Sequence, residues 1–85
     1  MDPGRLKKQI GANLARLRKE RGLTQEELAG RCGLEVTTVA SVERARRMPS
    51  VPSLVVIAEV LGVRADELLG ASGPRRRGEG SWPGT

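Results

Sequence analysis

Hydroxyl and guanidinium side chains recur at helical spacing near the middle of the chain. Thr37, Ser41 and Arg44 are four and three residues apart, so at 100° per residue they share one face of a helix. Hydroxyl groups can hydrogen-bond to base edges, and a guanidinium can bind guanine or a phosphate. Nothing in the sequence pairs a nucleophile with a base or clusters carboxylates in a pocket. These residues therefore predict recognition of a nucleic acid and argue against an enzyme.

Two short helices joined by a tight turn are expected to position these side chains. The run from Gln25 to Arg44 carries one narrow apolar stripe in each half, and both stripes must share a core. Gly33 lies between them and can take the left-handed conformation that ends a helix and turns the chain sharply. The second helix, at about 35–44, is the predicted recognition helix of a helix-turn-helix. The stripes consist of Leu28, Ala29 and Cys32, and of Val39 and Val42.

The first helix of this motif has a well-defined start. Thr24 and Glu27 form a capping box, and Leu23 can pack on Leu28 as a hydrophobic staple. Gln25 then lies at the positive end of the helix, where free N–H groups and the helix dipole attract an anion such as a DNA phosphate. The alternative is that Thr24 and Gln25 are ordinary capping residues.

Short groups of residues from about Ile10 to Leu69 match one protein family. They are Leu17-Arg18, Arg21-Gly22-Leu23-Thr24-Gln25, Glu43, Pro49-Ser50, Ile57-Ala58, Leu61-Gly62-Val63 and Asp66-Glu67-Leu68-Leu69. On these residues the chain resembles the DNA-binding domain of phage repressors and Cro-like proteins, the XRE-type helix-turn-helix family. The resemblance implies an all-α, compact five-helix fold. It also implies a transcription regulator that occupies an operator, either a freestanding Cro-like repressor or a small regulator resembling restriction-modification controllers.

The resemblance assigns roles along the recognition helix. Positions matching Val36, Thr37 and Ser41 contact base edges in the family, and the position matching Thr38 lies nearer a phosphate. Threonine and serine discriminate bases less well than arginine, asparagine or glutamine, and valine can touch only a thymine methyl. Direct readout of the sequence is therefore expected to be modest. The predicted base-facing residues are Val36, Thr37, Ala40, Ser41 and Arg44.

Two residues depart from the family pattern. Glu35 occupies the cap position where serine or threonine is usual, and its charge suits the helix dipole but is repelled by nearby phosphates. Ala45 stands where the family tends to carry a glycine after the recognition helix. Either this helix runs on slightly, or Ala45 adopts an unfavourable left-handed conformation.

Phosphate contacts are expected on both sides of the recognition helix. Such contacts position a protein on DNA without reading its sequence. The alternative for the two loop arginines, Arg46 and Arg47, is that they are simply solvated charges. The predicted phosphate-binding residues are Thr24, Gln25, Thr38, Arg46 and Arg47.

The resemblance further implies an ion pair beneath the motif. Arg18, on a first helix predicted to run to about Arg21, and Glu43, at the end of the recognition helix, match the positions that form this pair in the family. The alternative is that both residues are surface charges.

A homodimer is expected to form on the fourth helix. Val56 and Val60 are four residues apart and point roughly opposite to the inward-facing residues of that helix, and Val55 and Leu69 extend the pair. The alternatives are that this helix is buried all round or that its valines have no partner. A dimer would set two recognition helices about 34 Å apart on double-stranded DNA and require a pseudo-palindromic operator.

The composition suits a polyanionic partner. The chain of 85 residues has 15 Lys and Arg against 10 Asp and Glu, which gives a net charge of +5. One cysteine and no histidine exclude an internal disulfide and disfavour a zinc site, so we expect no metal, cofactor or small-molecule ligand. The sequence has neither a membrane-spanning stretch nor a hydrophobic signal segment, which predicts a cytoplasmic protein.

The chain divides into a domain and a tail. Residues 1–72 are predicted to form the DNA-binding domain, with flanking helices opened by Asp2-Pro3 and by Ser50. Residues 73–85 are rich in Gly, Pro and Arg and too poor in apolar residues to fold alone, so they are predicted to be a disordered basic tail. The competing function class is a protein-interaction module, such as an antitoxin or adaptor, with little specific DNA binding.

Overall fold

Five α-helices form the fold in this computed structural model, which describes residues 2–70. They are α1 (Pro3–Glu20), α2 (Gln25–Cys32), α3 (Val36–Glu43), α4 (Val51–Leu61) and α5 (Ala65–Leu69). The described residues contain no strand, and the predicted all-α, five-helix fold is confirmed. The predicted tail at 73–85 lies outside the described residues.

The helices begin where local capping chemistry predicts. The side chain of Asp2 accepts a hydrogen bond of 3.0 Å from the backbone N–H of Gly4 at the start of α1. Thr24 Oγ1 accepts one of 3.0 Å from Glu27 N, and Glu27 Oε1 accepts one of 2.9 Å from Thr24 N, which completes the capping box of α2. At the start of α4, Ser50 Oγ accepts a hydrogen bond of 3.2 Å from Ser53 N.

The recognition helix ends in a left-handed turn at an alanine. Ala45 has φ of 61°, and its N–H donates to Val42 O at 3.0 Å while Arg46 N donates to Ser41 O at 2.9 Å. This pair of bonds is a Schellman motif, in which glycine usually takes the left-handed position. Of the two alternatives for Ala45, the structure therefore shows the strained one, and α3 does not run on.

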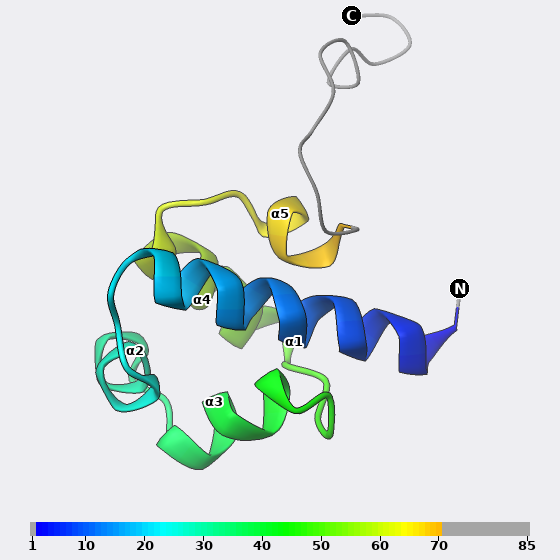
Figure 1. Ribbon diagram of the computed structural model, residues 1–85, viewed down its shortest axis with the longest axis horizontal. Helices are drawn as coiled ribbons and strands as arrows, with labels where there is room; N and C mark the ends of the chain where they lie inside the picture. The colour runs from blue at the N-terminus through cyan, green and yellow to red at the C-terminus, as the bar shows by residue number, and fades with distance from the viewer. Residues whose placement is uncertain (1, 71–85) are drawn as a thin grey trace, which may run out of the picture.

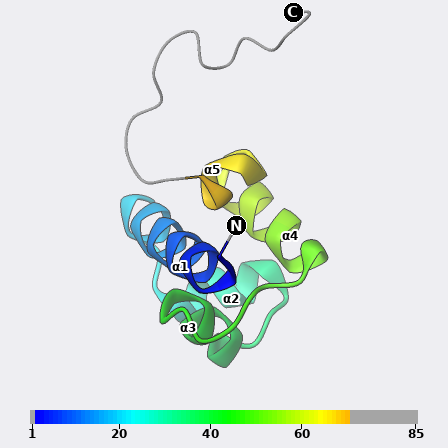
Figure 2. The ribbon, with the colours of Figure 1, turned by 90° about the vertical axis from the view of Figure 1, so that its right-hand side faces the viewer.

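The long helix α1 runs along one side of the molecule (Figures 1 and 2). α3 and α5 pack on opposite sides of it, and α2 fills the angle between α3 and α4 (Figures 1 and 2). α2 and α3 are joined by a short turn at Gly33, whose φ of 70° allows the chain to reverse within a few residues.

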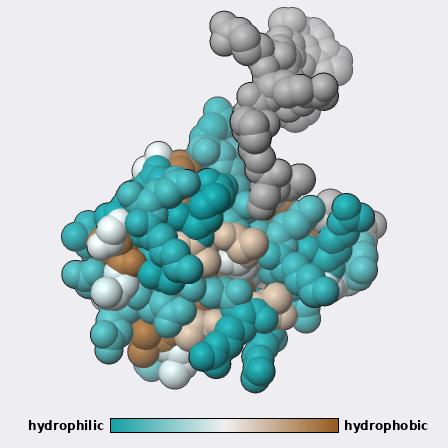
Figure 3. Space-filling model, in the orientation of Figure 1, coloured by the Kyte–Doolittle hydropathy of each residue, from teal (hydrophilic) through white to brown (hydrophobic). Residues whose placement is uncertain are grey.

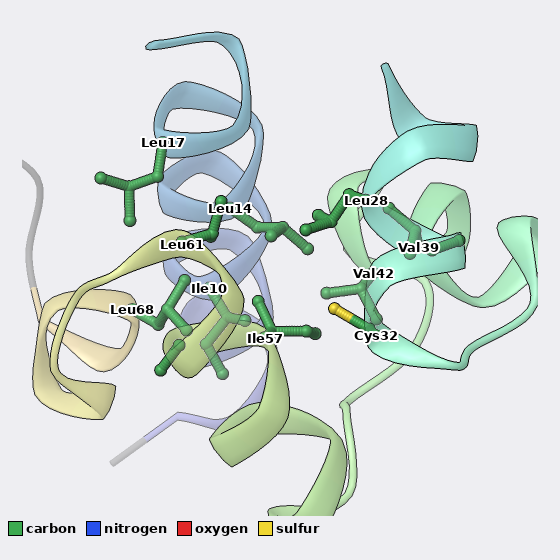
Figure 4. Packing of buried hydrophobic residues seen from close by; sticks show 12 residues of the cluster. Ile10, Leu14, Leu17, Leu28, Cys32, Val39, Val42, Ile57, Leu61 and Leu68 are labelled. Carbon is green, nitrogen blue, oxygen red and sulfur yellow. The ribbon is translucent and has the colours of Figure 1, made fainter. Parts of the chain in front are cut away.

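All five helices contribute to one apolar core (Figure 4). Leu28 of α2 and Val39 of α3 are fully buried, at 0% exposure, so the two helices of the motif are packed through their predicted stripes. The other core residues are Ile10, Leu14, Leu17, Ala29, Cys32, Val42, Ile57, Ala58, Leu61 and Leu68.

A buried amide holds α5 against α1. Asn13 is completely buried, and its Nδ2 donates to Leu68 O at 2.9 Å and to Gly70 O at 2.7 Å. These carbonyls lie at the end of a five-residue helix, where no further turn could satisfy them. Asn13 thus allows a short helix to end at the surface of α1.

Glycine is required where α1 crosses the end of α3. A Cβ atom at Gly11 would lie 2.5 Å from Val42 O and 2.8 Å from Glu43 O. Both atoms belong to backbone, which cannot move aside as a side chain can. The close approach of these two helices therefore depends on the absence of a side chain at position 11.

The apolar surface of α4 differs from the prediction. The sequence pattern predicted that Val56 and Val60 point roughly opposite to the inward-facing residues of α4, whereas both are half-buried and pack against the core. α4 contacts both α2 and α5, which buries a wider face than one packing partner would. The exposed valines of α4 are Val51, at 72%, and Val55, at 45%. In the view of Figure 3, hydrophobic side chains form small separate areas on a largely hydrophilic surface.

Replacing Gly11 by alanine should destabilise the fold. The new methyl group overlaps two carbonyl groups, and overpacking of this kind costs about 1–3 kcal/mol, more than the roughly 1 kcal/mol that alanine gains as a helix former. Gly30 in α2 is the matched control, because a Cβ there has no atom within 4 Å and Gly30→Ala should raise stability. Urea denaturation of both variants measures the two effects, and equal stability of the Gly11 variant and the wild type would contradict the crossing geometry.

Candidate nucleic-acid interface

The outward face of α3 carries the residues predicted to meet bases. Val39 and Val42 are buried in the core, and the other residues of the helix differ in their exposure. Val36, Thr37 and Arg44 are exposed, whereas Ala40 and Ser41 are half-buried. An α-helix with its side chains is about 10–12 Å across, close to the roughly 12 Å width of the major groove. The face can therefore enter the groove without a change in the fold.

An ion pair fixes the C-terminal end of α3. Arg18 Nε donates to Glu43 Oε2 at 2.6 Å, and Arg18 Nη2 donates to Glu43 Oε1 at 3.1 Å. The side chains are only 11% and 8% exposed. Arg18 Nη1 also donates to Leu23 O at 2.8 Å. One guanidinium thus joins α1, the turn before α2 and the last residue of α3.

The surroundings of Glu43 keep it ionised. Burial alone would raise the pKa of its carboxyl, but hydrogen bonds from Arg18 and Gln25 and the charges of Arg18 and Lys19 outweigh it, so the pKa lies below its ordinary value. The hydrogen bond to Glu43 raises the pKa of Arg18 in turn. Both partners therefore remain charged around neutral pH.

Gln25 takes part in this network. Its side-chain Nε2 donates to Glu43 Oε1 at 2.9 Å, so the amide predicted to bind a phosphate is held by a carboxylate instead. Thr24 Oγ1 is likewise engaged, by the backbone of Glu27. What remains for an anion at this end of α2 is the pair of backbone N–H groups of Gln25 and Glu26, which make no hydrogen bond within residues 2–70.

Carboxylates at the start of α2 oppose an anion there. The bonds to the backbone and hydroxyl of Thr24 lower the pKa of Glu27, and Glu26 is its exposed acidic neighbour in the first turn of the helix. These negative charges stabilise the helix dipole but repel a phosphate. The stronger electrostatic attraction for an anion comes from the exposed arginines after α3.

The loop after α3 presents cations beside the recognition face. Arg44, Arg46 and Arg47 are exposed, and none of them forms an ion pair with another described residue. Arg47 Nη1 lies 3.5 Å from Thr38 Oγ1, which brings together two of the predicted phosphate ligands. The bond from Arg46 N to Ser41 O ties the start of this loop to the helix.

Other chemistry finds little support in the described structure. Cys32 is buried in the core, and burial raises the pKa of its thiol, which disfavours the reactive thiolate. The described residues include no cluster of three or more side chains that could hold a metal ion. None of the helices within residues 2–70 is both long and apolar enough to span a membrane.

Sequence reasoning overlooked several polar contacts that hold this interface in place. Gln25 was interpreted as a phosphate ligand or an ordinary capping residue, and its bond to Glu43, 18 residues away, has no local signal. Arg21 Nε donates to Leu61 O at 2.8 Å and satisfies the end of α4. Asn13 lies three residues from Ile10 on the apolar face of α1, a spacing that could have marked it as buried.

Known proteins similar to this chain share the motif. The HTH_3 family model, described as helix-turn-helix, matches residues 14–68. The chain is 47% identical over 64 residues to an uncharacterized HTH-type transcriptional regulator, y4dJ, of Sinorhizobium fredii, a match that covers 75% of this chain and 83% of the relative. It is 36% identical over 61 residues to the immunity repressor protein of Bacillus phage phi105, covering 72% of this chain and 42% of the repressor.

Solved structures agree with the sequence relatives. The restriction-modification controller protein C.AhdI from Aeromonas hydrophila superimposes with a TM-score of 0.71 at 35% identity, covering 73% of this chain and 94% of the controller. The hypothetical transcription factor NHTF from Neisseria gives a TM-score of 0.76 at 37% identity, covering 84% of this chain and 82% of that protein.

Breaking the Arg18–Glu43 pair from either side should destabilise the protein strongly. Glu43→Gln or Arg18→Met leaves one charge desolvated without its partner, and such changes cost about 3–5 kcal/mol. Glu20→Gln is the control, because Glu20 is 52% exposed and its pairs with Arg16 and Arg21 should contribute less than about 1 kcal/mol. Thermal melts compare the three variants with the wild type. Unchanged melting temperatures in both Glu43→Gln and Arg18→Met would refute a stabilising role of the ion pair.

The same pair predicts a dependence of stability on pH. The folded pKa of Glu43 is lowered, so its contribution is present above the unfolded value of about 4.3 and is lost as the pH falls from there through the folded pKa. Glu43→Gln should lack this part of the acid destabilisation. Denaturation midpoints measured from about pH 7 down to about pH 3 would show this. The midpoint of the Glu43→Gln variant should fall less steeply with decreasing pH than that of the wild type.

Proposed function

The chain belongs to the HTH_3 helix-turn-helix family, and from this membership we propose that it is a sequence-specific DNA-binding transcriptional regulator that docks α3 in the major groove. The observation that carries the proposal is the arrangement around α3. The start of its outward face is exposed, its inner face is buried in the core, and arginines without an ion-pair partner among the described residues follow directly after it. A regulator of this kind must share a compartment with the DNA that it binds, so we propose that the protein is cytoplasmic.

Two sets of residues divide the work on DNA. We assign base contacts to one face of α3, at the exposed Val36 and Thr37 and the half-buried Ala40 and Ser41, with the exposed Arg44 at its end. Phosphate contacts fall to Arg46, Arg47 and Thr38, together with the N–H groups at the start of α2, next to Thr24 and Gln25. Phosphate contacts supply affinity and register, and base contacts supply the preference for one sequence.

A homodimer would compensate for a weakly discriminating face. Short side chains on α3 limit the specificity of one domain, whereas two copies on a pseudo-palindromic operator double the number of base pairs read. The surface for pairing consists of exposed apolar side chains on and next to α4 and α5. These are Met48 at 39%, Val51 at 72%, Val55 at 45% and Leu69 at 37% exposure. Half-buried Val56 and Val60 lie on the same helix and flank this set.

The competing function is a protein-interaction module on the same scaffold. Val36, 39% exposed at the start of α3, is the observation that favours it, because an exposed valine suits a protein partner as well as a thymine methyl. A gel shift with genomic DNA fragments, competed by excess nonspecific DNA, separates the two. Retention of particular fragments supports the regulator, and the absence of any retained fragment supports the module.

Binding to DNA should fall steeply with salt, and two kinds of substitution should act differently. Arg46→Ala and Arg47→Ala should weaken binding to all sequences alike and reduce the salt slope by about one unit per lost contact. Thr37→Ala and Ser41→Ala should instead narrow the difference between operator and random DNA. Fluorescence anisotropy over a range of salt concentrations measures both effects. Arginine variants that change sequence preference, with hydroxyl variants that do not, would reverse our assignment.

The dimer should dissociate when charge is placed on α4. Val55→Lys puts a cation into a surface that is exposed in the monomer, so the domain should fold normally while self-association weakens at least tenfold. Analytical ultracentrifugation of the wild type and the variant, alone and on operator DNA, tests this. Arg31→Glu changes an exposed charge on α2 that is not part of the proposed surface and serves as the control. A wild type that stays monomeric on DNA would end the proposal.

A further inference from the structure

The cap residue of the recognition helix has an uncommitted carboxylate. Glu35 is the N-cap of α3, with φ of −74° and ψ of 144°, yet its side chain makes no capping hydrogen bond. The caps of α1, α2 and α4, in contrast, each accept a bond from the backbone of their own helix. Glu35 is exposed and forms no ion pair with any residue in 2–70. Its acceptor oxygens are therefore free to meet a ligand.

The position of Glu35 is the one from which base edges are read. Residues at the N-terminal end of a recognition helix reach deepest into the major groove. The neighbouring side chains there, Val36 and Thr37, offer a methyl surface and one hydroxyl, neither of which forms a bidentate pair with a base. Glu35 is thus the strongest hydrogen-bonding group at this end of α3.

The chemistry of a carboxylate selects one kind of base. An ionised carboxylate only accepts hydrogen bonds, and the major-groove edges offer donors in the amino groups of cytosine and adenine. On adenine the amino group stands beside N7, an acceptor that repels a carboxylate, whereas the cytosine edge carries no acceptor there. Resting on the proposed docking of α3, we propose that Glu35 is a specificity-determining residue that accepts a hydrogen bond from the 4-amino group of a cytosine in each operator half-site.

The charge of Glu35 also contributes to specificity by weakening binding to DNA that lacks the cytosine. On random DNA its carboxylate is brought close to phosphates without a donor, which weakens nonspecific binding. On the right cytosine the same group gains a partner. A residue that disfavours wrong sequences in this way compensates for a face otherwise built from threonine, serine and valine.

Selection of binding sites from random DNA tests the assignment. The wild type should prefer cytosine at one position of each half-site by about tenfold, the discrimination expected of one good base contact. Glu35→Gln should move that preference to adenine, because an amide pairs with adenine N6 and N7, and Glu35→Ala should lose the preference. Glu20→Gln removes an exposed carboxylate from α1 and is the matched control, expected to select the wild-type sequence.

A cytosine analogue checks the contact directly. In 2-pyrimidinone the 4-amino group is absent, so placing it at the selected cytosine should weaken binding of the wild type about tenfold and leave Glu35→Ala unchanged. If the Glu35→Gln protein selects the same base as the wild type at every position, or if the analogue weakens both proteins equally, the assignment is overturned while the proposed function stands. A wild type that selects no sequence would overturn both.

Discussion

The position of the recognition helix depends on a guanidinium that reaches three parts of the chain at once. Arg18 bonds to Glu43 at the end of α3 and to the carbonyl of Leu23 before α2, and Gln25 completes the set by donating to the same carboxylate. An apolar core of equal volume could stabilise the fold as well, but it would fix distances less strictly than these directional bonds do. The relative orientation of α2 and α3, and with it the angle at which α3 meets a groove, follows from this network.

The backbone crossing at Gly11 acts on the same end of α3. Carbonyl oxygens of Val42 and Glu43 lie directly against α1, so the C-terminal end of the helix is held by contact as well as by charge. The N-terminal end is tied less tightly, through the turn at Gly33 and the burial of Val39. The C-terminal end of α3 is thus fixed against α1, whereas Glu35 and Val36 at its N-terminal end are exposed to solvent.

The features that the sequence predicted well are those encoded within a few residues. The capping box of Thr24 and Glu27 sets the start of α2, and glycine at positions 33 and 62 sets the ends of α2 and α4, because these signals act through neighbouring backbone. Gln25 could not be placed in the same way, since its partner Glu43 is brought to it only by the packing of α2 on α3. The packing of Val56 and Val60 against the core could not be predicted for a related reason. A periodic pattern shows that a helix has an apolar face, but not that neighbours on two sides widen it.

The left-handed conformation of Ala45 has a consequence for the entropy of binding. An alanine with φ of 61° carries strain of about 1–2 kcal/mol, which glycine would avoid. Alanine also has fewer backbone conformations available, so the segment that carries Arg44, Arg46 and Arg47 samples a narrower ensemble in the free protein. Under the proposed function, less freedom is then lost when Arg46 and Arg47 bind DNA phosphates. The cost of ordering the loop is met once, during folding, and is not repeated at each encounter with DNA.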